Sequence, residues 1–300
     1  MSRKRILYLI IGLIIGIVLI ILWLHYIDLN ELVARMKRID TRLVFWATIS
    51  YLAAYFIRSV RWNILLSKQA SISIWKTYLY SMGGNWVNYL IPIRAGELVK
   101  AWFVKHNHGN SITSVLPSIF IDKTFDTLGI FFVLLMIPLL KVKFSQGLII
   151  LLILLGLVFA VSLAVLLLSV WQKDKVVRFL QVLFSWLPKK LKTKVNNYIS
   201  IFVQGLNIFE HHWTRLLNSF LLTALGVFLD GLYFYLLFLA FGIDYPFLKV
   251  LFGYTLINLS YAIPQPPAQL GSNEWMMIII FSVGFALTRE DASAIMAFAH

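Results

Sequence analysis

Long runs of apolar residues, separated by short polar segments, extend along the whole chain. The first run has no charged residue over 19 positions, and it lacks a small-residue cleavage site. A helix of this length crosses the bilayer core, so we expect it to be a retained membrane helix. Eight such runs lie at residues 6–24, 43–57, 77–91, 113–140, 147–171, 216–241, 247–263 and 275–288. Backbone groups in lipid need hydrogen bonds within their own segment, so the pattern predicts an all-α integral membrane protein with one transmembrane domain over residues 1–300.

Two apolar runs are interrupted in the same way. The first interruption reads NYLIPIRAGELVKAW (residues 88–102), and the second reads SYAIPQPPAQLGSNEWM (residues 260–276). Both contain Tyr-x-Ile-Pro, then a glycine, then a glutamate, and such paired breaks in two halves are typical of a transporter's binding site. We expect two re-entrant hairpins in pseudo-repeated halves; the alternative is two polar loops that look alike. The residues that break the helices are Pro92, Gly96, Pro264, Pro267 and Gly271.

Charged side chains inside apolar runs are costly in a bilayer and mark transport paths. We predict that a substrate head group is bound at the first break and near the end of the second apolar run, by Asn88, Arg94, Glu97, Lys100, Arg58 and Arg61. We assign a second set to a polar cavity or a coupling ion: Asp122, Lys123, Asp126, Asp230 and Glu274. Arginine suits a phosphate because its planar fork donates two bonds at once.

A purely structural interpretation of these residues stays open. Lys123 reaches Asp126 at i,i+3 spacing, so one alternative is that the two side chains form an ion pair with a purely structural role. The same holds for Arg94 and Glu97. Asp230 has no partner nearby in the sequence and needs one elsewhere in the bundle. Glu274 follows Gly271, and one alternative for its carboxylate is a purely structural role in stabilising a helix N-terminus.

Residues 172–215 form the largest polar stretch and contain two amphipathic stripes. The first consists of Val176, Phe179, Leu180, Leu183 and Leu187, and the second of Val195, Tyr198, Ile199, Phe202 and Leu206. Pro188 and a lysine run separate them, so we expect two interfacial helices that meet anionic lipid head groups. Earlier in the chain, Asp28 and Glu31 have capping-box spacing before another amphipathic segment.

Basic residues also predict the topology. Arg3, Lys4 and Arg5 place the N-terminus in the cytoplasm by the positive-inside rule. If residues 77–105 dip into the membrane and return, the eight basic residues of 172–215 are cytoplasmic as well. If residues 77–91 instead cross the membrane fully, the eight basic residues of 172–215 lie outside the cell and violate the rule. The charge distribution therefore favours a re-entrant hairpin in the plasma membrane of a prokaryote.

Composition narrows the class of function. Hydrophobic residues make up 60% of the chain and charged residues 13%, whereas soluble domains contain about a quarter charged residues. The chain has no cysteine, which excludes disulfides, thiolate metal sites and cysteine nucleophiles. The net charge of +14 comes from residues beside membrane segments, so we expect lipid head groups and not nucleic acid as partners.

Histidines provide the main argument for an enzyme. His106 and His108 lie in a polar loop without acids at ligand spacing, and the adjacent His211 and His212 point apart on a helix. We therefore expect no metal, no cofactor and no catalytic residue.

Three motifs in order resemble the transmembrane flippase-like region of lysylphosphatidylglycerol synthases. The first motif comprises Asn88, Pro92, Arg94, Gly96, Glu97 and Lys100, the second Asp122, Lys123 and Asp126, and the third Pro267, Gly271 and Glu274. Ala268 and Gln269 stand where the third motif has glycines, which leaves the tightness of that loop undetermined. The resemblance covers nearly the whole chain and implies a helical bundle with two re-entrant elements. It also implies flipping of aminoacylated phospholipids, although the relatives' aminoacyl-transferase domain has no counterpart in these 300 residues.

The sequence thus predicts a translocase for an anionic or aminoacylated phospholipid or a polyprenyl-phosphate-linked lipid. The alternative is a non-transporting anchor for a lipid-modifying or glycosyl-transferring enzyme. A second copy of the chain or such an enzyme is the expected protein partner. Residues 292–300 are too short to span a membrane, and the sequence leaves open whether the natural chain continues past His300.

Overall fold

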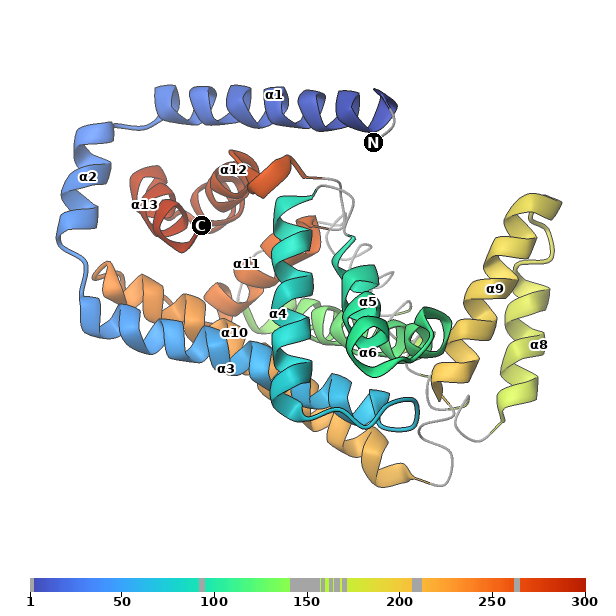
Figure 1. Ribbon diagram of the computed structural model, residues 1–300. Coiled ribbons are helices and arrows are strands. Elements are labelled where there is room, and N and C mark those ends of the chain that lie inside the picture. Colours follow the sequence, from blue (N-terminus) through green and yellow to red (C-terminus); the bar gives the residue numbers. More distant parts are fainter. Residues whose placement is uncertain are drawn as a thin grey trace. The chain divides into compact units, whose positions relative to one another are not determined.

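The computed structural model describes residues 3–91, 95–140, 172–206, 212–261 and 265–300, with single positions at 157, 160, 161, 164 and 168. These residues are helical and contain no strand, which confirms the expected all-α fold (Figure 1). Pro92, Arg94 and Pro264 lie outside the described residues, as does most of the expected helix at 147–171.

The helices follow the apolar runs with shifted ends. In the first half they are α1 (Arg3–Tyr26), α2 (Leu29–Lys37), α3 (Thr41–Leu66), α4 (Ile74–Leu90), α5 (Gly96–His108), α6 (Ile112–Leu134) and η1 (Ile137–Leu140). In the second half they are α8 (Lys173–Leu183), α9 (Lys189–Leu206), α10 (Trp213–Ala240), α11 (Phe247–Ser260), η3 (Pro267–Gln269), α12 (Ser272–Met277), the π-helical η4 (Ile278–Val283) and α13 (Arg289–Ala299). Because α3 extends to Leu66, Arg58 and Arg61 both lie inside this helix.

Two of these helices, α3 and α10, are long and apolar enough to cross a membrane among the described residues. A third candidate is the pair formed by residues 11–26 of α1 and most of α2, which is bent by 91°. Asp28 makes this bend abrupt, since its carboxylate accepts hydrogen bonds from the backbone of Asn30 and Glu31 and so starts α2. The expected capping box is confirmed on the Asp28 side.

The two long helices run antiparallel. At one end of the pair, the Asp40 N–H donates to the Ala240 carbonyl at 2.9 Å. Farther along, Ser50 Oγ donates to the Leu229 carbonyl at 2.8 Å, and Arg61 Nη1 donates to Thr223 Oγ1 at 2.8 Å. The end of α3 and the start of α10 therefore lie on the same side.

Each Pro/Gly break joins two antiparallel helices. In the first hairpin, Tyr80 of α4 stacks on Phe103 of α5, while Gly84 and Asn88 approach Gly96 at the start of α5. In the second hairpin, Gly253 of α11 lies against the Phe281 ring of η4. Helices that turn back beside themselves are the geometry expected of re-entrant elements.

Contacts divide the chain into two compact units. The first unit comprises Met1–Ala54, Gly83–Gly96 and Val227–His300, and the second comprises Tyr55–Met82 and Glu97–Gly226. Helices α3, α4 and α10 run through both units. The assignment of residues 1–300 to one transmembrane domain stays a prediction.

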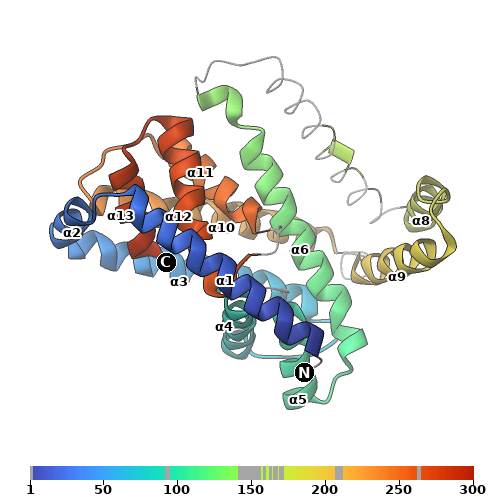
Figure 2. The same cartoon turned by 90° about the horizontal axis from the view of Figure 1, so that it is seen from above.

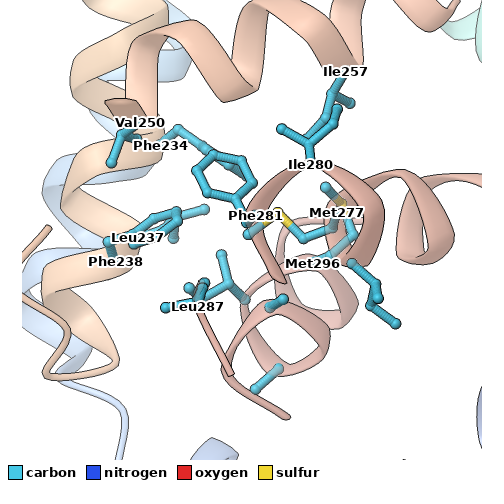
Figure 3. Close-up of a cluster of buried hydrophobic side chains, with 14 of the residues drawn as sticks. Phe234, Leu237, Phe238, Val250, Ile257, Met277, Ile280, Phe281, Leu287 and Met296 are labelled. Carbon is cyan, nitrogen blue, oxygen red and sulfur yellow. The ribbon is translucent and has the colours of Figure 1, made fainter. Parts of the chain in front are cut away.

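Aromatic residues form the core of the first unit. Phe234 and Phe238 of α10 pack against Phe281 of η4, and Met277, Leu287 and Met296 surround them (Figure 3). Gly253 lets the Phe281 ring lie against the α11 backbone, because a Cβ at that position would meet the ring at 2.2 Å. Such burial fixes α12, η4 and α13 around the second break.

In the second unit, α9 packs along α6, and α8 lies beside α9 (Figure 2). The residues that pack inward are Val177, Leu180, Phe184, Val195 and Ile199, against Ile121, Phe125 and Leu128 of α6. Of the predicted stripes, Leu180, Val195 and Ile199 pack inward, and the interfacial role of α8 and α9 stays a prediction. Phe179, Leu183 and Tyr198 are exposed, because α8 and α9 present one row of apolar residues to the protein and another outward.

Candidate functional site

Seven charged residues of α3, α5 and α6 converge in the second unit. We call them the charge cluster: Arg58, Arg61, Glu97, Lys100, Asp122, Lys123 and Asp126. All seven were predicted as site residues from the sequence. The cluster joins residues up to 68 positions apart in the chain.

Arg61 forms the buried end of the charge cluster, with 1% of its side chain exposed. Its Nε donates to Asp122 Oδ1 at 2.8 Å, and its Nη2 donates to Asp126 Oδ1 at 2.5 Å. Nη1 donates to Thr223, and Nη2 also reaches the Asp122 carbonyl at 3.2 Å. The guanidinium is therefore satisfied by protein groups, and it fixes both aspartates one helical turn apart on α6.

Lys123 links the two other helices of the charge cluster. Its Nζ lies 3.0 Å from Glu97 Oε1 on α5 and 3.2 Å from Asp126 Oδ2 on α6. Glu97 also pairs with Lys100 at 3.3 Å, and the Lys100 ammonium lies 5.1 Å from the centre of the Trp62 ring. The first break is thus tied to α6 through Glu97.

The charge cluster opens to the surface on one side. About half of the Lys123 side chain is exposed (49%) and about a quarter of that of Arg58 (27%), whereas Arg61 and Asp122 are buried. Arg58 Nε lies 3.9 Å from Asp126 Oδ1, a longer contact than the Arg61 bonds. The two partly exposed members, Lys123 and Arg58, are both cations, and cations at a surface attract anions.

At the first break, Asn88 and Gly96 make a structural contact. Asn88 Oδ1 accepts a 2.7 Å hydrogen bond from the Gly96 N–H, which satisfies one free amide at the start of α5. A Cβ on Gly96 would lie 1.9 Å from the Gly84 carbonyl oxygen, so only glycine fits there. This contact accounts for the Asn and Gly of the first motif; binding of substrate by Asn88 stays a prediction.

The loop of the second break is tight although two glycines are replaced. Ala268 and Gln269 have φ values of 51° and 55°, in the left-handed region that glycine normally occupies. Gly271 is left-handed as well, and a Cβ there would meet Leu19 of α1 at 2.4 Å. Ala268 and Gln269 therefore keep the loop as tight as glycines would.

Helix α1 holds this loop in place. Gly12 and Gly16 let Pro266 and Pro267 approach α1 closely. Trp275 Nε1 donates to the Leu19 carbonyl at 3.0 Å. The prolines of the second break therefore serve as packing surfaces as well as helix breakers.

Glu274 lies in the first turn of α12 with 3% of the residue exposed. Its Oε1 lies 2.7 Å from His300 Nδ1, and His300 Nε2 lies 2.6 Å from the Ala268 carbonyl. Bonding to Glu274 raises the pKa of His300 above its ordinary value, and this effect outweighs the opposing effect of burial. Glu274 and the charge cluster belong to different units.

Asp230, the remaining predicted residue, is half-buried on α10 in the first unit. It interacts electrostatically with Tyr233, which lines a cavity of about 280 Å³ together with Thr48, Tyr51 and Phe298. The role of Asp230 in a polar cavity or in ion coupling stays a prediction.

Sequence reasoning missed Thr223 and His300. Thr223 is a hydroxyl in an apolar helix, and no local spacing connects it to Arg61. His300 is 26 residues from Glu274, so no helical periodicity relates them. His106 and His108, which were considered as metal ligands, contact the aromatic rings of Trp102 and Tyr80 instead.

Comparisons with known proteins agree with the motifs. The family model of the lysylphosphatidylglycerol synthase TM region matches residues 9–300. A UPF0104 membrane protein of Methanothermobacter thermautotrophicus is 24% identical over 90% of this chain and 81% of its own length. No solved structure matches the chain.

Two further relatives match over shorter stretches. A UPF0104 membrane protein of Pyrococcus horikoshii is 28% identical over 39% of this chain and 36% of its own length. The glycosyltransferase AglD of Haloferax volcanii is 26% identical over 40% of this chain and 19% of its own length. The full-length match, the three motifs and the helical spans together show that this chain is an integral membrane protein of the lysylphosphatidylglycerol synthase transmembrane-region family.

Proposed function

We propose that the protein moves an anionic or aminoacylated phospholipid, or a polyprenyl-phosphate-linked lipid, between the two leaflets of a prokaryotic plasma membrane. The observation that carries this proposal is the partial exposure of two cations of the charge cluster, Lys123 and Arg58, on the same side of the cluster as Asp126. A lipid phosphate is an anion that these two cations can bind through charge-assisted hydrogen bonds.

The proposed binding step is an exchange of partners. The phosphate takes over Lys123 and Arg58 from Asp126, while Arg61 keeps the aspartates in position. Arg58 offers a planar fork that can hold two phosphate oxygens at once. Glu97 keeps Lys123 and Lys100 near the start of α5, and Arg94, three residues earlier in the chain, is an additional candidate ligand.

The lipid tails stay in the bilayer during this exchange. In the most apolar 18-residue stretch of α3, only 22% is buried within the protein, and in that of α10 only 28%. Apolar residues on the remaining surface can face acyl or prenyl chains. A polar head group bound by protein with tails in lipid is the arrangement that lipid translocation requires.

A membrane anchor for a lipid-linked glycosyl-transferring enzyme is the second candidate. The partial match to a protein named as a glycosyltransferase favours it. An anchor has no need of a charged cluster with exposed cations, and this difference separates the two proposals.

Mass spectrometry of the lipids that co-purify with the protein tests the proposal. We expect anionic or polyprenyl-phosphate lipids to be enriched over the bulk membrane. Arg58→Gln should remove most of the enrichment, because it deletes a cation at the exposed side of the charge cluster. Lys105→Gln, an exposed position on α5, is the matched control and should retain it.

A lipid profile equal to that of the bulk membrane in the wild-type protein would contradict head-group binding. So would an unchanged profile in Arg58→Gln at normal expression and thermal stability. Co-purification of a glycosyl-transferring enzyme without lipid enrichment would favour the anchor.

A further inference from the structure

The His300 ring connects the end of α13 to two parts of the second break. One nitrogen, Nδ1, lies 2.7 Å from the Glu274 carboxylate on α12, and the other, Nε2, lies 2.6 Å from the Ala268 carbonyl in the loop. Neither residue of this bridge belongs to the charge cluster. His300 is therefore the partner of Glu274, a residue expected in a polar cavity.

Counting hydrogens shows that this arrangement holds an extra proton. The Ala268 carbonyl oxygen can only accept, so Nε2 carries a hydrogen. An ionised Glu274 can also only accept, so Nδ1 must then carry a second hydrogen. If Glu274 is protonated instead, its Oε1 carries the hydrogen and donates it to Nδ1. In both forms the pair holds one proton more than a neutral imidazole beside a carboxylate.

The surroundings of Glu274 favour retention of this proton. Its second oxygen, Oε2, is buried and makes no hydrogen bond to the described part of the chain. Within the described ranges, His300 is the only cation within ion-pair distance of Glu274. An ionised carboxylate buried without a cation is strongly disfavoured, so the imidazolium offsets its burial.

Other titratable groups around the pair are tyrosines. Tyr89 of α4 meets the His300 ring edge to face at 5.8 Å between ring centres and also faces Glu274. Tyr261, at the end of α11, lies near Glu274, while α1 contacts α12 through apolar Leu19 and the Tyr26 ring. A tyrosine hydroxyl is neutral at physiological pH, so none of these groups replaces the proton.

Two more tyrosines lie beside the last residues of α13. Tyr51 and Tyr233 line the cavity that also contains Phe298 and Ala299. The charged residues of α13 itself are in its first turn, at Arg289, Glu290 and Asp291, and Asp291 pairs with Arg35 of α2. These charges are nine or more residues from His300 in the chain.

We propose that Glu274 and His300 form a proton-binding site, in which one proton between Glu274 Oε1 and His300 Nδ1 holds α13 against the second break. When this proton leaves for solvent, only one ring nitrogen keeps a hydrogen, so lone pairs face each other at either the Glu274 contact or the Ala268 contact, and the bridge is broken on that side. Proton binding at this site can be tested without a lipid assay. That the bound proton also controls lipid movement rests on the proposed function.

The sign of the pH dependence follows from the raised pKa of His300. The contact contributes its full stability below the ordinary histidine pKa of about 6.5. Its contribution is lost as pH rises through the higher pKa of the folded state. The second break should therefore be held below the raised pKa of His300 and released above it.

Nuclear magnetic resonance of histidine-labelled protein in micelles tests the site. The chain has six histidines, and His300→Gln identifies the resonance of interest. Both ring nitrogens of His300 should have protonated chemical shifts at about pH 6, and the titration midpoint should lie above about 6.5. Glu274→Gln should lower this midpoint by about one unit or more. Glu290→Gln on α13 is the control and should leave it unchanged.

A neutral His300 ring at about pH 6, or the same midpoint in Glu274→Gln, would overturn the proposal. If Glu274→Gln does not fold, thermal melts replace it. As pH rises from about 6.5 to about 9, the melting temperature of the wild type should fall more than the melting temperature of His300→Gln. Parallel pH profiles of the two proteins would also overturn the proposal, whatever the result of a lipid assay.

Discussion

At the scale of single residues, the two breaks hold their shape by different means. The first break uses close approach, since Gly96 lies against the Gly84 carbonyl and receives the Asn88 side chain. The second break uses backbone conformation, with Ala268 and Gln269 in the left-handed region. Left-handed non-glycine residues cost about 1–2 kcal/mol each, so the surrounding contacts must hold them there.

Gly96→Ala should destabilise the protein strongly, by about 3 kcal/mol or more, because its methyl group would overlap a backbone carbonyl. Gly109→Ala is the comparison. Gly109 has a φ of +73° but open space around it, so the change costs only about 1–2 kcal/mol of backbone strain. Thermal unfolding in detergent measures both, and equal losses would show that the close approach at Gly96 is not maintained.

Ala268→Gly should raise the melting temperature. Removing the left-handed strain gains about 1–2 kcal/mol, and the added freedom of the unfolded chain takes back about 0.4–1 kcal/mol. Ala224→Gly, at an exposed position inside α10, should instead lose about 1 kcal/mol. A lower melting temperature for Ala268→Gly would mean that the loop is not left-handed at this position.

At the scale of elements, the antiparallel pair α3 and α10 supports the predicted topology. The end of α3 leads into a segment with Lys68 and Lys76, and the start of α10 follows the basic residues 172–215. Because these two ends lie on the same side, both basic segments can be cytoplasmic without violating the positive-inside rule. The outward apolar row of α8 and α9, which includes Val182 and Trp186, suits a membrane interface.

Single cysteines at Ser2 and Thr193 should therefore be protected from an impermeant thiol reagent in intact cells. The chain has no natural cysteine, so no background needs to be removed. Asp244→Cys, just after α10, should be labelled from outside and serves as the positive control. Labelling at position 193 from outside would remove the re-entrant assignment of residues 77–105.

At the scale of the whole molecule, local rules predicted helices, the Asp28 cap and the pairing of Lys123 with Asp126. These features depend on residues within one turn of each other. The sequence also identified the seven members of the charge cluster as charges that lipid would not tolerate. It could not pair Arg61 with Asp122, Lys123 with Glu97, or His300 with Glu274. Those contacts depend on how helices far apart in the chain pack, and charge alone does not determine that.

Movement of a fluorescent phosphatidylglycerol between leaflets of proteoliposomes tests the central claim most directly. The wild-type protein should move the lipid faster than empty vesicles do. Lys123→Gln should slow movement about tenfold or more, since a lost charge-assisted contact of about 1.4 kcal/mol corresponds to that factor. Lys105→Gln should retain the wild-type rate. Movement no faster than in empty vesicles, or an unchanged rate in Lys123→Gln, would contradict the account.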